Sequence, residues 1–149
     1  MCSVMGGASE SEFDVNTGMW RGTVTSANNG GFVGIRTTPS FLFNMENCVG
    51  IELKLKGGNG KRFKAVIRDS TDFNGVCWTT SFDAPKLFGD FFGGSTSVGT
   101  VKIPFDKQIP TIFARTVPDQ QFKNDNLVGL QLAYSKVCCL MHILHIAKR

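Results

Sequence analysis

Hydrophobic and polar residues alternate along most of the chain. The stretch IELKLK at residues 51–56, for example, has an apolar residue at every second position. A period of two places alternate side chains in a core and leaves the others in solvent. The pattern predicts strands at 20–26, 32–37, 51–56, 63–68, 76–82, 101–105 and 128–134. Helical periodicity is almost absent, so we predict an all-β fold, either a sandwich or a jelly roll.

Segments rich in Gly and Asn separate the predicted strands. Residues 57–60 (GGNG) are typical of a hairpin turn, because Gly and Asn adopt positive φ at low cost. We expect further turns at 28–31 and 72–75. The connection 83–99 is long for a sandwich, and long loops are often functional or disordered. Its phenylalanines indicate packing on the body or on a partner: Phe88, Phe91 and Phe92.

The alternation stops at Val137, and the tail CCLMHILHIAKR follows. This apolar tail is compatible with a short buried helix, with a strand, or with a segment foreign to the domain. Its register continues none of the preceding strands. We therefore divide the chain into a domain at 1–136 and an atypical tail at 137–149.

Charge and cysteine content limit the possible binding partners and the possible cellular compartment. Sixteen basic residues against twelve acidic ones give a net charge of +4, and the basic residues are scattered at solvent-side strand positions rather than clustered as in a nucleic-acid binder. Five cysteines without regular spacing indicate a reducing compartment. The first residues form neither a signal nor a transit peptide, and no apolar stretch is long enough to span a membrane. We favour a piece of a longer precursor over a cytosolic protein.

Candidate catalytic groups are few. The two histidines, His142 and His145, lie close to Cys138 and Cys139, but structural zinc sites usually consist of two spaced half-sites. No histidine outside the tail can serve as the base for a nucleophile. A phosphate loop needs a following helix, whereas the glycines at 57–60 precede a strand pattern. We therefore predict no enzyme activity, no metal and no cofactor.

The segment IFARTVPD at 112–119 stands out, because no periodicity demands its Arg115 and Asp119. Two roles remain open for Arg115. It can pin its loop by a charged hydrogen bond to a nearby carboxylate, or it can meet a carboxylate of a partner.

Six motifs occur in one order along the chain: SVMGGASES, NNGGFVGIRT, VGIELKLKGGNGKRFKAVIR, TVKIPF, FARTVPD and LVGLQLAYSK. Together they resemble the complex I intermediate-associated protein 30 family over residues 3–136. The pairing of NNGGF with RTVPD and the ending LQLAYSK are most similar to the plastid branch, which includes high chlorophyll fluorescence photosystem II factors.

The resemblance implies a galactose-binding-like jelly-roll sandwich and a non-catalytic assembly factor or chaperone. The expected partners are protein subunits of a respiratory or photosynthetic complex, and no small-molecule ligand is expected. The expected location is an organelle, the chloroplast in preference to the mitochondrion. Motif residues are the candidates for partner binding: Asn28, Asn29, Arg36, Arg115, Thr116 and Asp119.

Departures from the family pattern and rival functions remain open. The family has an Asn-Asp pair before VMGG and a final strand after LQLAYSK, so the sequence leaves open a sandwich that is incomplete at both ends. A carbohydrate-binding module would use Trp20 and Trp78 for stacking, although Trp78 shares a face with Val76 and Phe82 and is expected in the core. The net positive charge also leaves open an RNA-associated plastid translation factor, with weak and salt-dependent binding.

Overall fold

The computed structural model describes residues 10–25, 31–37, 44–58, 60–72, 74–86, 98–113, 115–135 and 138–149. These residues contain one short 3-10 helix, η2 (Phe105–Lys107), and otherwise strands and loops, which confirms the all-β prediction. The strands are β1 (Glu10–Asp14), β2 (Met19–Thr23), β3 (Val33–Arg36), β4 (Gly50–Gly57), β5 (Arg62–Arg68), β6 (Cys77–Asp83), β7 (Val98–Pro104), β8 (Ile109–Ile112), β9 (Arg115–Thr116), β10 (Gly129–Tyr134) and β11 (Cys138–Lys148).

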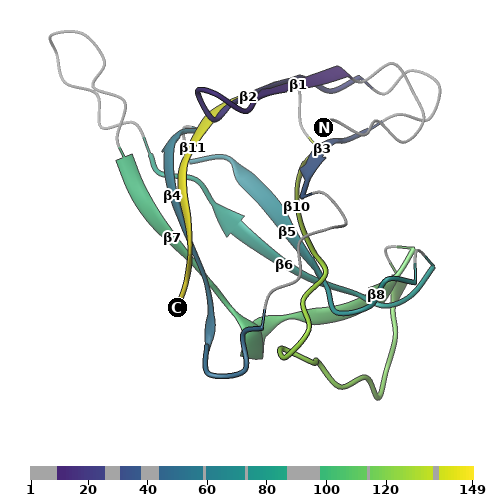
Figure 1. The fold of residues 1–149 in the computed structure, drawn as a ribbon. Helices are drawn as coiled ribbons and strands as arrows, with labels where there is room; N and C mark the ends of the chain where they lie inside the picture. Colours follow the sequence, from purple (N-terminus) through teal and green to yellow (C-terminus); the bar gives the residue numbers. More distant parts are fainter. Residues whose placement is uncertain are drawn as a thin grey trace, which may run out of the picture.

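The strands form two sheets on either side of one core (Figure 1). One sheet has five strands in the order β1-β2-β11-β4-β7, and the other has six in the order β3-β10-β5-β6-β8-β9. Neighbouring strands pair antiparallel throughout the described residues. In the part of the chain that the structure describes, no helix has the length and apolar character needed to cross a membrane.

Strand β5 illustrates how the alternation builds the core. Its residues Phe63, Ala65 and Ile67 are buried, whereas Arg62 and Lys64, which alternate with them, are exposed. The strand therefore has one face in the sandwich and one face in solvent, as the period of two predicts.

An aromatic cluster joins the two sheets at the centre of the core. The ring of Phe63 lies 4.8 Å from that of Tyr134 and 5.7 Å from that of Phe82, both in the six-stranded sheet. It also lies 5.8 Å from the ring of Trp20, which belongs to the five-stranded sheet. Phe63 is thus a common contact of both layers.

The tail is a strand of the sandwich. β11 lies between β2 and β4, near the middle of the five-stranded sheet, and its Met141 is fully buried (Figure 1). The register shifts between Ile143 and His145, and this irregularity interrupts the pattern that the sequence analysis used. Of the three alternatives left open for the tail, the structure shows the strand.

The prediction of a hairpin at 57–60 is wrong. β4 belongs to the five-stranded sheet and β5 to the six-stranded sheet, so this turn carries the chain from one layer to the other. Glycine is still required in this turn for its backbone conformation, because Gly57, Gly58 and Gly60 all have positive φ. Alternation reports which face of a strand is buried, but it does not report which sheet the strand joins.

Two other predicted connections had different outcomes. The turn at 72–75 is confirmed, since Gly75 N donates to Asp72 O at 3.0 Å and β5 pairs with β6. Of the long connection 83–99, residues 87–97 with Phe88, Phe91 and Phe92 lie outside the described residues.

Candidate functional site

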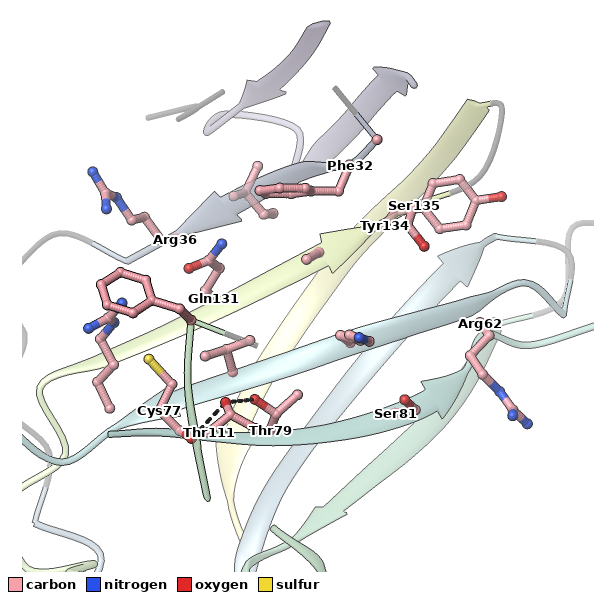
Figure 2. A pocket seen from close by; sticks show the side chains of 18 of the residues that line it. Phe32, Arg36, Arg62, Cys77, Thr79, Ser81, Thr111, Gln131, Tyr134 and Ser135 are labelled. Carbon is pink, nitrogen blue, oxygen red and sulfur yellow. Dashed lines mark hydrogen bonds between the residues drawn. The ribbon is translucent and has the colours of Figure 1, made fainter. Parts of the chain in front are cut away.

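The outer face of the six-stranded sheet is hollowed into a groove of about 640 Å³. Figure 2 shows Phe32 and Arg36 on the β3 side and Thr79 and Thr111 on the β6–β8 side. The described residues that line it are Gly31, Phe32, Gly34, Ile35, Arg36, Arg62, Lys64, Val66, Arg68, Asn74, Gly75, Cys77, Thr79, Ser81, Thr111, Phe113, Gln131, Ala133, Tyr134 and Ser135.

Strand register explains where the groove is open. Lys64 on β5 lies opposite Ala133 on β10 and opposite Ser81 on β6, and Ala133 in turn lies opposite Gly34 on β3. These small neighbours leave free space around the Lys64 side chain, which is exposed. Lys64 is therefore the one long, charged side chain in a row that otherwise consists of small residues.

The adjacent row carries larger polar groups. Gln131 on β10 lies opposite Arg36 on β3 and opposite Val66 on β5, and Val66 lies opposite Thr79 on β6. A second hollow of about 240 Å³ shares Arg36, Val66, Arg68 and Gln131 with the groove. The groove therefore continues past this row towards the end of β5.

The groove is lined by cations. Arg36, Arg62, Lys64 and Arg68 contribute four positive charges, and the described lining residues include no Asp or Glu. Arg62 Nε donates to Asp83 Oδ1 at 2.8 Å and Nη2 donates to Asp83 Oδ2 at 3.1 Å. This bidentate hydrogen bonding raises the pKa of Arg62 and lowers the pKa of Asp83. The pair partly neutralises one end of the groove.

We predict that this ion pair makes stability depend on pH only in acid. The folded pKa of Asp83 is below the ordinary value of 3.8, so the contribution is fully present above that value and is lost as pH falls through the folded pKa. Because both side chains are more than half exposed, the effect is small. Urea unfolding at pH 7 and pH 3 should show a smaller acid loss in Asp83→Asn than in the wild type. Asp125→Asn, at an exposed position outside the groove, is the control; an equal loss in wild type and Asp83→Asn would contradict the assignment.

The floor between β6 and β8 is built from hydroxyl groups. Thr111 Oγ1 donates to Cys77 O and also lies 3.2 Å from Thr79 Oγ1 (Figure 2). Burial raises the pKa of the Cys77 thiol, an effect that Arg68 opposes and Asp69 reinforces. A thiol with a raised pKa stays protonated at neutral pH and is a poor nucleophile. This floor is therefore suited to hydrogen bonding rather than to covalent chemistry.

Phe113 stands at the turn between β8 and β9 and lines the groove. Its side chain is 75% exposed and its φ is 48°. A bulky residue with positive φ is strained, by on the order of 1 kcal/mol. Phe113 is outside the core because the strand ends one residue earlier, at Ile112.

One of the predicted partner-binding residues lies in the groove. Arg36, at the end of β3, is exposed and lines both hollows. Asn28 and Asn29 lie outside the described residues.

The other three predicted residues lie at the opposite edge of the sheet. Arg115 and Thr116 form β9, an exposed edge strand, and Asp119 is exposed with a φ of 57°. Within the described ranges no ion pair joins Arg115 to Asp119, since the ion pair found there is Arg62–Asp83. The structure does not bring Arg36 together with this group, because four strands lie between β3 and β9 in the sheet.

Most of the groove is not evident from the sequence alone. Lys64, Thr79 and Gln131 occupy ordinary solvent-side positions of the alternating pattern. The sequence signal for the groove is that polar positions alternate with buried positions in three strands, which places all of these polar side chains on solvent-facing surfaces. It becomes informative only when the strand order is known, because β10 lies beside β5 although some 60 residues of chain separate them.

The two tryptophans are core residues. Trp20 is fully buried and Trp78 is 5% exposed, with its Nε1 donating to Asp69 Oδ2 at 3.0 Å. The expectation that Trp78 belongs to the core is confirmed, and neither ring can stack on a sugar. The candidate metal ligands Cys138, Cys139, His142 and His145 lie on β11, and their side chains are outside the described residues.

Residues 3–138 match the family described as complex I intermediate-associated protein 30. The chain belongs to this family. It is a family of assembly factors associated with complex I. None of the curated proteins compared with the chain matches it.

A solved structure supports the fold. The family 11 carbohydrate-binding module of the cellulosomal cellulase Lic26A-Cel5E from Clostridium thermocellum is 15% identical to the chain. The match covers 95% of this chain and 86% of that one, with a TM-score of 0.56. At this level of identity the likeness concerns the fold, and it confirms the predicted jelly-roll, galactose-binding-like sandwich.

Proposed function

We propose that this chain is the client-binding domain of an assembly factor, and that it holds protein subunits during the biogenesis of a large organellar membrane complex. The observation that carries the proposal is the family match over residues 3–138. The groove agrees with a binding role, because its described lining residues offer cations, hydroxyls and an amide but neither a carboxylate nor an imidazole for proton transfer.

The groove is the proposed contact site for the client. It is open, it spans several strands of one sheet, and it carries exposed side chains of both polar and apolar character. Such a surface can hold another polypeptide without any change to the fold that supports it. Arg115, Thr116 and Asp119 at the β9 edge are proposed as a second, smaller contact.

The test is recovery of identified client subunits. A tagged chain incubated with solubilised organelle membranes should enrich subunits of one large membrane complex over the tag alone, as measured by quantitative mass spectrometry. Enrichment of no membrane-complex subunit from either mitochondria or chloroplasts would contradict the proposal.

The organelle is proposed from the motifs alone. NNGGF, RTVPD and LQLAYSK are most similar to the plastid branch, so we propose the chloroplast as the location. Parallel recoveries from the two organelles test this. Photosynthetic subunits are expected, and recovery of complex I subunits only would assign the chain to the mitochondrion instead.

A further inference from the structure

We propose that the groove binds an acidic segment of the client in an extended conformation, with its carboxylates at Lys64 and Arg36 and an apolar residue against Phe113. This inference rests on the proposed function, and it adds the chemistry of the partner. Three observations carry it: the sign of the charge in the groove, the spacing of the cations and the exposure of a strained phenylalanine.

The sign of the charge is the first observation. Arg36, Lys64 and Arg68 line the groove together with Arg62, and of these Arg62 already forms an ion pair with Asp83. The described lining residues include no carboxylate that could balance the charges of Arg36 and Lys64. A hollow with one sign of charge and low-dielectric walls concentrates ligands of the opposite sign. The occupant is therefore anionic.

Spacing is the second observation. Lys64 and Arg68 lie on one face of β5, four residues apart, which corresponds to about 13 Å at 3.3 Å per residue. Arg36 lies two strands away from β5, about 10 Å across the sheet, and is in register with Val66, two residues along from Lys64, so Lys64 and Arg36 are about 12 Å apart. An extended peptide repeats its side chains on one face about every 7 Å, so carboxylates four residues apart, separated by about 13 Å, match both distances. On a helix, carboxylates one turn apart are only about 6 Å apart, so a helical segment would need carboxylates two turns apart to reach both cations.

Phe113 is the third observation. An exposed aromatic side chain on a backbone with positive φ is retained at a cost in stability, and such strain is typical of functional positions. The ring lines the groove, the floor of which includes the apolar side chain of Val66. An apolar residue of the client would be desolvated where it packs against the Phe113 ring. The segment is therefore acidic but not purely polar.

A polypeptide fits the groove better than a nucleic acid does. A phosphate backbone carries one charge per nucleotide and is bound by many cations in succession. Here the cations are separated by small and neutral residues such as Ala133, Thr79 and Gln131. The hydroxyl and amide groups of Thr79 and Gln131 suit the peptide groups of an extended chain.

Lys64 provides the first test. The probe is a short fluorescein-labelled peptide in which Glu alternates with Ser around one Leu, and its binding to the full chain is followed by fluorescence anisotropy. Lys64→Glu should weaken binding by about tenfold or more, because attraction becomes repulsion. Lys54→Glu is the matched control, since Lys54 is an exposed lysine on β4 in the other sheet, and it should bind as the wild type does.

Phe113 provides the second test, with two readouts of opposite sign. Phe113→Gly removes the ring and relieves the strain at positive φ, so the melting temperature should rise by about 3 °C while peptide binding weakens. Val15→Ala removes another side chain that is 75% exposed, and it should leave binding unchanged. Unchanged binding in Phe113→Gly would remove the apolar part of the proposal.

The outcomes separate this inference from the proposed function. Client subunits that are recovered by the wild type and Lys64→Glu alike would overturn the inference and leave the assembly role standing. Recovery of none by the wild type contradicts the assembly role itself. Equal binding of a Lys-for-Glu peptide, or tighter binding of a single-stranded RNA oligonucleotide than of the acidic peptide, would also overturn the inference.

Discussion

Deletion of residues 138–149 is expected to abolish cooperative folding. The deletion removes β11, which pairs with β2 on one side and with β4 on the other, and it removes the fully buried Met141. The edges of β2 and β4 would then expose unpaired backbone groups next to an opened core, a combination that favours aggregation. Circular dichroism during thermal unfolding should show no sigmoidal transition, and the truncated chain should elute as aggregate from a sizing column.

A pair of point variants in β11 controls for the loss of chain length. Met141→Asp places a charge in the core and should lower the free energy of unfolding by several kcal/mol. Ile146→Asp is the control, because Ile146 is 44% exposed on the same strand and should change stability much less. A truncated chain that unfolds at the wild-type temperature would show that the tail is foreign to the domain after all.

Phe63→Ala is expected to be the most destabilising single truncation in the core. Phe63 is 1% exposed and contacts the rings of Trp20, Phe82 and Tyr134, so its removal leaves a cavity bounded by both sheets. Comparable substitutions cost about 3–5 kcal/mol, out of a total stability of about 5–15 kcal/mol for a typical domain. The melting temperature should fall on the order of 10 °C, as measured by calorimetry.

Phe113→Ala is the matched control for this truncation. The same atoms are removed, but the Phe113 ring is 75% exposed, so little buried area is lost and stability should change by less than about 1 kcal/mol. A large loss in Phe113→Ala, or a small one in Phe63→Ala, would contradict the assignment of Phe63 to the core.

The strands were largely predictable from the sequence, because burial on one face imposes a period of two. The segment 63–68 was predicted, and β5 spans Arg62–Arg68. The partners of the strands were not predictable, since alternation is the same in either sheet. The turn at 57–60 illustrates this limit, because its glycines fit a hairpin and a crossing between sheets equally well.

The groove could be predicted only in part for the same reason. Arg36 was singled out from its motif, and it lines the groove. Lys64 and Gln131 become neighbours of Ala133 and Val66 only through the pairing of β5 with β10, which is a long-range contact. The sequence around a solvent-facing residue does not show whether its neighbours on other strands are small.

The place of β11 also has a consequence for synthesis of the protein. This strand is made after all the other strands that the structure describes, yet it lies between β2 and β4 in the sheet. Until residues 138–148 have left the ribosome, the early strands of that layer lack the neighbour that joins them. Until β11 is made, the nascent chain exposes the open edges of β2 and β4, and such edges favour aggregation.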